Sequence, residues 1–146
     1  MSKSLHSLLG GALLGLSALA VADDGAALFT QHCSGCHGPQ AVGIEGIAPP
    51  LHNPELWQSL GAQAPRYIAG VMSGGLSGSL NVAGLDYMGL VMPPQSQIDS
   101  AQLASIAGYV LGELNGVTSA PDAALIDQLK AAPLSHKELR TIRKGS

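Results

Sequence analysis

The sequence predicts one all-α domain with a short hairpin, and three observations lead to this architecture. Residues that favour helix starts precede several apolar segments along the chain. The glycine-rich stretch Gly74–Gly89 interrupts this pattern, and its residues are compatible with a short hairpin around Ala83-Gly84. The chain has 146 residues, of which 46% are hydrophobic and 12% are charged. This length and composition suit one globular domain.

Each helix that we expect begins at a capping residue or a proline. In the first half of the chain these starts are Asp24, whose helix runs into Cys33, Asn53-Pro54, whose helix reaches Leu60, and Pro65. In the second half they are Asp99 with Gln102, for a helix over 100–114, then Pro121, then Ser135 with Glu138 as a capping box.

The N-terminal segment has the pattern of a secretory signal peptide over residues 1–22. Lys3 supplies a positive charge, residues 8–19 are apolar or small, and Ala20-Val21-Ala22 forms a cleavage site. We therefore expect export to the periplasm. A retained membrane anchor is the alternative, because residues 4–22 contain no Asp, Glu, Lys or Arg and 19 residues suffice to span a bilayer. Membrane contact is expected only if this segment is retained.

Charge is distributed unevenly along the chain. Residues 23–129 contain one cation, Arg66, and nine acidic side chains, whereas residues 130–146 contain five cations and one acid. Nucleic-acid binding is not expected, because it requires clustered Lys and Arg that the acidic body lacks. A protein partner with a positively charged docking face fits better.

The motif Cys33-Ser34-Gly35-Cys36-His37 contains both cysteines of the chain. A disulfide or a thioredoxin-like redox pair has no need of the adjacent histidine. A structural zinc site needs four ligands, and the other histidines show no matching spacing. Covalent haem attachment uses all three side chains: two thiolates form thioethers with the porphyrin, and the histidine becomes an axial iron ligand. One such motif predicts one haem c.

A second axial ligand is expected among the methionines. Met92 precedes Pro93-Pro94, which present it from a stiff non-helical segment, so it is the preferred candidate. Met88 lies four residues earlier in the same stretch and is the alternative. Met72 belongs to a helical stripe with Ile68, which is typical of a core residue.

Taken together, residues 23–114 resemble a class I c-type cytochrome. Four motifs in the family's order carry the resemblance: Gly25 with Phe29 before the cysteines, "APPL" at 48–51, "MPP" at 92–94 and "IAGYV" at 106–110. The resemblance implies helices wrapped around one covalently bound haem. It also implies that Pro49 offers its carbonyl to His37, that Leu51 lines the haem pocket, and that Gly25 and Phe29 cross Tyr109.

Two departures from the family pattern are visible. Many relatives have Tyr-x-Gly-x-Met-Pro in the ligand loop, whereas here one more residue separates Gly89 from Met92. Residues 115–146 lie beyond the resemblance and are expected to form a helical C-terminal extension. Because of the first departure, the geometry of the ligand loop stays open. The choice between Met92 and Met88 as the ligand stays open for the same reason.

The function implied is electron transfer rather than catalysis, between a redox protein donor and a redox protein acceptor. A haem subunit of a dehydrogenase complex is an alternative, since it would use the same domain. If neither methionine bound iron, peroxidase or gas-sensing chemistry would be the further alternative, with His52 as the nearest acid-base group. Trp57 and Arg66 are candidate donors to a haem propionate.

Overall fold

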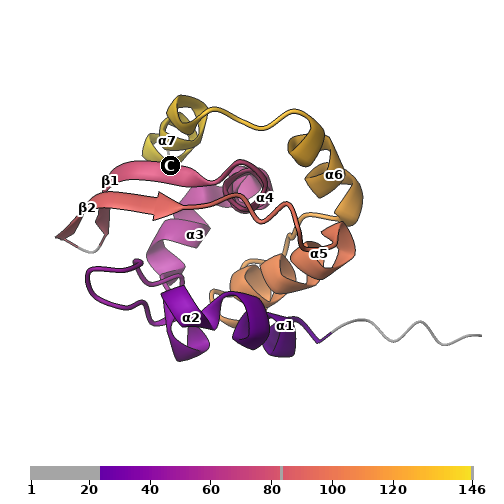
Figure 1. Cartoon of the computed structure of the whole chain (residues 1–146), viewed down its shortest axis with the longest axis horizontal. Coiled ribbons are helices and arrows are strands. Elements are labelled where there is room, and N and C mark those ends of the chain that lie inside the picture. Colours follow the sequence, from indigo (N-terminus) through magenta and orange to yellow (C-terminus); the bar gives the residue numbers. More distant parts are fainter. Residues whose placement is uncertain (1–23, 83, 146) are drawn as a thin grey trace, which may run out of the picture.

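The computed structural model describes residues 24–82 and 84–145, which are mostly helical with one two-stranded antiparallel sheet (Figure 1). This agrees with the predicted helical class and its hairpin. The predicted signal peptide, residues 1–22, and Ala83 of the predicted turn lie outside the described residues.

The chain forms seven α-helices, three short helical segments and two strands within the described ranges. The first half contains α1 (Gly25–His32), α2 (Ser34–His37), η1 (Pro39–Ala41), α3 (Pro54–Leu60), η2 (Gly61–Gln63) and α4 (Ala64–Gly74). The second half contains β1 (Leu76–Val82), β2 (Leu85–Met92), α5 (Ser100–Gly108), the π-helical segment η3 (Tyr109–Glu113), α6 (Ala123–Ala131) and α7 (His136–Lys144).

Local capping explains where most helices begin. The side chains of Asp24, Asn53 and Asp99 accept hydrogen bonds from backbone N–H groups in the first turns of α1, α3 and α5. The predicted capping box of Ser135 and Glu138 is also present. The helix start predicted at Pro121 differs from the structure. Helix α6 begins two residues later, at Ala123, and the side chain of its N-cap residue Asp122 accepts a hydrogen bond from the backbone N–H of Leu125.

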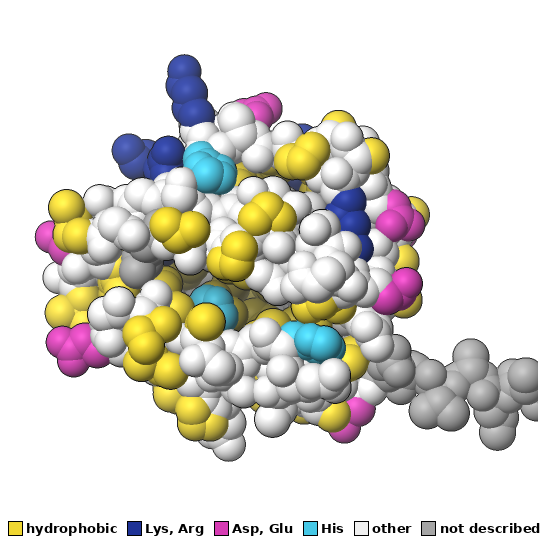
Figure 2. All heavy atoms as spheres, in the orientation of Figure 1, with side chains coloured by type: hydrophobic (Ala, Val, Ile, Leu, Met, Phe, Trp, Pro, Cys, Tyr) yellow, Lys and Arg dark blue, Asp and Glu magenta, His cyan; other side chains and the backbone are white. Residues whose placement is uncertain are grey.

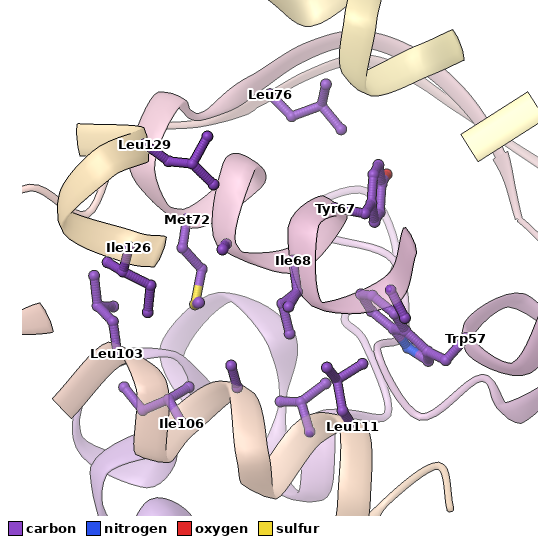
Figure 3. Close-up of a cluster of buried hydrophobic side chains, with 14 of the residues drawn as sticks. Trp57, Tyr67, Ile68, Met72, Leu76, Leu103, Ile106, Leu111, Ile126 and Leu129 are labelled. Carbon is purple, nitrogen blue, oxygen red and sulfur yellow. The ribbon is translucent and has the colours of Figure 1, made fainter. Parts of the chain in front are cut away.

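Helix α4 forms the centre of the hydrophobic core. Figure 3 shows its side chains Tyr67, Ile68 and Met72 between residues of α3, α5 and α6. Met72 is buried in this cluster, as its helical stripe predicted. The core therefore occupies the side of the molecule where α4, α5 and α6 meet.

The first and last core helices cross at a glycine, as the resemblance implied. A Cβ atom at Gly25 would overlap the backbone oxygen of Ser105 in α5. One turn later, Phe29 packs on Tyr109 with a ring centroid distance of 5.6 Å. Only a residue without a side chain lets α1 approach α5 so closely, and this contact holds the cysteine motif beside the core.

The C-terminal extension packs into the same core. Ile126 and Leu129 of α6 and Leu139 of α7 are fully or almost fully buried. Polar contacts join α6 to the rest of the fold, because Ser100 donates to Asp127 and Lys130 donates to the carbonyl of Ile98. The extension is therefore a structural part of the described domain.

The hairpin β1–β2 is longer than the short one predicted, and it extends to Met92, which we expected in a loop. A register shift within it places one residue of β1 opposite both Met88 and Gly89 of β2. Gly89 has φ 66°, which favours glycine and is typical of a β-bulge. The pairs on either side of this bulge are Gly78 with Leu90 and Leu80 with Tyr87.

Candidate functional site

The cysteine motif lies at the end of α1 and on the single turn of α2. Cys33 joins the two helices, and Gly38, with φ 73°, ends the second. His37 lies on the buried side of this turn, with 8% of its surface exposed. Because the helical turn brings Cys33, Cys36 and His37 together, the three side chains of the motif reach one region of the molecule.

A short loop contacts the imidazole of His37 through a backbone carbonyl. Its Nδ1 atom lies 3.2 Å from the carbonyl oxygen of Pro49, the hydrogen bond that the resemblance implied. The backbone N–H of Gly43 donates to the carbonyl of His37 at 2.7 Å, and that of Leu51 donates to Ala41 at 2.9 Å. These backbone bonds fix the Pro49 carbonyl relative to the ring.

Replacing Gly43 with Ala is expected to disturb this loop. Gly43 has φ 81°, and an added Cβ atom would lie 2.6 Å from the backbone nitrogen of Pro50. Gly46 provides a matched control, since it has φ 74° and open space around its Cβ position. Both variants should lose about 1 to 3 kcal/mol through backbone strain, and Gly43→Ala should lose a further 1 kcal/mol or more, roughly, through the clash. Denaturant unfolding measures both losses, and equal losses would contradict this account of Gly43.

A cavity of about 390 Å³ opens beside the motif. Figure 2 shows it as a hollow across one face, lined mainly by hydrophobic side chains and containing histidine. All six residues that the sequence predicted for haem attachment, ligation and the haem pocket line it: Cys33, Cys36, His37, Pro49, Leu51 and Met92. Helix α2 and the hairpin β1–β2 therefore contribute separate walls of one cavity.

The structure separates the two candidate methionines. Met92 pairs with Leu76, and opposed residues in a hairpin project to the same face; both line the cavity. Met88 is 74% exposed and does not line it. In a regular strand, residues four apart share a face, so the bulge at Met88 and Gly89 produces this difference.

Burial sets the electrostatics of the motif. It lowers the pKa of His37 below its ordinary value, against a smaller opposing effect of the hydrogen bond to Pro49. It also raises the pKa of Cys33 to about 11, with the neighbouring Cys36 as a smaller cause. The imidazole is therefore neutral near pH 7, as a metal ligand must be. A reactive redox pair would need a lowered thiol pKa, which Cys33 does not have.

Other candidates from the sequence lie elsewhere or are already bonded. Trp57 lines the cavity, but its indole N–H donates to the carbonyl of Leu51 at 2.7 Å. Arg66 and His52 are exposed and do not line the cavity. In the parts of the chain that the structure describes, no group of three or more His, Cys, Asp or Glu side chains could hold a metal ion. This does not favour the zinc alternative.

Sequence reasoning missed two residues near the cavity. Asn115, which directly follows the helix predicted over 100–114, is buried, and its side chain donates to the carbonyls of Leu51 and Val110. Its oxygen accepts from the backbone N–H of Asn53 at 2.7 Å. Arg143 of α7 lines the cavity, although it comes from the extension. An Asn-Gly pair signals a turn but not burial, and nothing local marks Arg143.

The fold and the site define a small helical protein with a cofactor-sized cavity beside a Cys-x-x-Cys-His motif. The sequence matches the cytochrome c family over residues 22–112. A cytochrome c-552 of Thermus thermophilus is 32% identical over 145 residues, covering 98% of this chain and 87% of the relative. The chain therefore belongs to the cytochrome c family.

Two further relatives differ in how much of their length is matched. Another cytochrome c-552 from Thermus thermophilus is 30% identical over 122 residues, covering 82% of this chain and 84% of the relative. The cbb3-type cytochrome c oxidase subunit CcoP of Helicobacter pylori is 34% identical over 108 residues, covering 74% of this chain and 32% of the relative. Membership of the family implies covalently bound haem c. No helix in the described part of the chain has the length and hydrophobicity of a membrane span.

Proposed function

We propose that the chain carries one haem c in the cavity between α2 and the hairpin. Cys33 and Cys36 would form its thioethers, His37 would be one axial ligand, and Met92 would be the other. Pro49 would orient the His37 ring through the Nδ1 hydrogen bond, and Leu51 would pack against the group. The observation that carries this proposal is that both cysteines, His37 and Met92 line the same cavity.

The residues present fit such a group. The cavity volume of about 390 Å³ lies within the range of roughly 300 to 1,000 Å³ that is usual for cofactor sites. Most of its lining is apolar, and it contains neutral imidazole, thiol and thioether side chains. These are ligand types that bind haem iron, whereas no carboxylate, a ligand type that suits hard cations, occurs among the described residues that line the cavity.

We infer that the protein is a carrier of single electrons and not an enzyme. When bound, haem supplies an iron that exchanges one electron. Met92 and His37 would occupy both axial positions and so exclude oxygen or peroxide, which argues against the peroxidase and gas-sensing alternative. The apolar walls, including Leu76 and Trp57, would exclude water and favour the ferrous state.

The donor and acceptor are proposed to be redox proteins with a positively charged docking face. Support comes from the nine acidic side chains and one cation of residues 23–129. The signal-peptide pattern of residues 1–22 supports a location in the periplasm. Electron exchange with a basic partner should slow as ionic strength rises, because salt screens opposite charges.

Replacing both Cys33 and Cys36 with Ser tests the attachment of the cofactor. The variant should lose covalent haem completely, since serine forms no thioether, and denaturing gel electrophoresis with haem staining would show this. The unchanged chain is the control. It should stain for haem, and the pyridine haemochrome assay should give one haem per molecule. Haem retained by the variant under denaturing conditions would contradict the proposal.

A second candidate is a haem subunit of a larger oxidoreductase complex. The match to the oxidase subunit CcoP supports this second candidate, although that match covers 32% of the relative. Purification from native membranes and soluble extract separates the two functions. Recovery of the protein alone in the soluble fraction supports the carrier, whereas co-purification with other redox subunits supports the complex.

A further inference from the structure

The side chain of Asn115 is a buried amide that joins two segments far apart in the sequence. Only 2% of the residue is exposed. Its N–H groups donate to the carbonyls of Leu51 at 2.9 Å and Val110 at 2.6 Å, and its oxygen accepts from the backbone N–H of Asn53 at 2.7 Å. Carbonyls only accept and a backbone N–H only donates, so a single orientation of the amide satisfies all three partners. The side chain is therefore held in that orientation.

The end of the last core helix sets the position of Asn115. In the π-helical segment η3, the N–H of Leu114 donates to the carbonyl of Tyr109, five residues back, and the Val110 carbonyl accepts from the Asn115 side chain. Gly116 follows with φ 68°, which lets the chain leave the helix directly after Asn115. The helix end therefore supports this amide from an element separate from residues 51–53, which it contacts.

The segment that Asn115 contacts also carries the hydrogen-bond acceptor for His37. Leu51 lies two residues after Pro49, whose carbonyl oxygen is 3.2 Å from Nδ1 of His37. Pro49 and Pro50 have no backbone N–H, and their rings fix φ. The Pro49 carbonyl is therefore held in place through the residues on either side of this stiff pair. A displacement of Leu51 would be passed on to that carbonyl.

Two donors hold the carbonyl of Leu51, and they differ in where they come from. The indole N–H of Trp57 donates to it at 2.7 Å, from α3, which begins directly after residues 51–53. Asn115 donates to the same carbonyl and accepts from Asn53, so it holds both ends of residues 51–53. Trp57 can move together with this segment, whereas Asn115 ties it to the far end of the core.

We propose that Asn115 is a positioning residue for the axial ligand His37. Its amide holds residues 51–53 and thereby the Pro49 carbonyl, which fixes the tautomer and the orientation of the His37 ring. This rests on the proposed function, because His37 is an axial ligand only in a chain that carries haem. A fixed hydrogen bond keeps the basicity of the imidazole constant, and the redox potential depends on that basicity.

Solvent exchange of the His37 Nδ1 proton tests this role in the reduced, haem-loaded protein. Nitrogen-15-edited NMR measures its rate, and the slowest backbone N–H groups of α5 report opening of the whole domain in the same sample. Asn115→Ala removes all three side-chain bonds, whereas Asn115→Asp keeps the shape and the acceptor, and its ionised carboxylate donates to neither carbonyl. In both variants the His37 proton should exchange about fivefold faster or more relative to the α5 groups, the factor that corresponds to one hydrogen bond.

Gln58→Ala is the matched control. Gln58 is exposed, and its side chain donates to the backbone carbonyl of Asn115 at 3.2 Å, so its loss leaves the bonds of the Asn115 side chain in place. The same ratio of rates should stay within about twofold of that in the unchanged protein. One folded variant of Asn115 is enough to decide the outcome.

An unchanged ratio in the Asn115 variants would overturn the inference, because Asn115 would then stabilise only the fold. An equal increase in Gln58→Ala would overturn it as well. The proposed function fails in a different way, since the unchanged protein would then lack a haem c absorption spectrum.

Discussion

Replacing Met92 with Ala is expected to abolish the sulfur-to-iron charge-transfer band of the oxidised protein and to lower its midpoint potential. Thioether ligation raises the potential of haem iron, so its loss should exceed the roughly 59 mV that correspond to a tenfold change in a one-electron equilibrium. The variant should also bind added cyanide or carbon monoxide quickly, because one axial position opens. Absorption spectroscopy with potentiometric titration measures all three effects.

Met88 provides the control for this experiment. Met88→Ala should leave the band and the potential unchanged, because this side chain is exposed and lies outside the cavity. Deleting Met88 is a stronger test. It removes the extra residue of the bulge and keeps Met92 opposite Leu76, so the band should persist. Loss of the band in either Met88 variant, with retention in Met92→Ala, would transfer the ligand role to Met88.

Replacing Leu139 with Ala is expected to destabilise the whole domain. This side chain is fully buried, and it lies against Gly70 of α4. Truncation of a buried leucine costs about 2 to 5 kcal/mol, a large part of the roughly 5 to 15 kcal/mol that keep a typical protein folded. Denaturant unfolding, followed by circular dichroism and by haem absorbance, should show one transition at lower denaturant concentration.

Lys137 on the same helix is exposed and provides the control, because Lys137→Ala should change the free energy of unfolding by less than about 0.5 kcal/mol. A small loss in Leu139→Ala would mean that α7 is an independent appendage. Two separate unfolding transitions would also mean that α7 is an independent appendage.

Local chemistry made much of the fold predictable. Asp24, Asn53 and Ser135 cap their helices through side-chain bonds to neighbouring backbone groups, and such signals span only three or four residues. The cysteine motif is equally local, because one helical turn brings its thiols and imidazole together. These features need no knowledge of the rest of the chain.

Long-range packing was not predictable in the same way. Asn115 lies 64 residues from Leu51, to which it donates a hydrogen bond, and nothing in its neighbourhood specifies that partner. Arg143 reaches the cavity because Leu139 fixes α7 against α4, which depends on tertiary packing. The sequence therefore indicated the chemistry of the motif, whereas the polar supports of the cavity became visible only in three dimensions.

The bulge at Gly89 also bears on how the proposed ligand residue would be located in relatives of this protein. A search that counts two positions forward from this glycine, as the family spacing suggests, reaches Val91, whose side chain is 74% exposed. Counting one position back from Pro93 reaches Met92 instead. The proline is therefore the better anchor for aligning this segment, because a residue inserted in the hairpin does not change the spacing between the methionine and the proline.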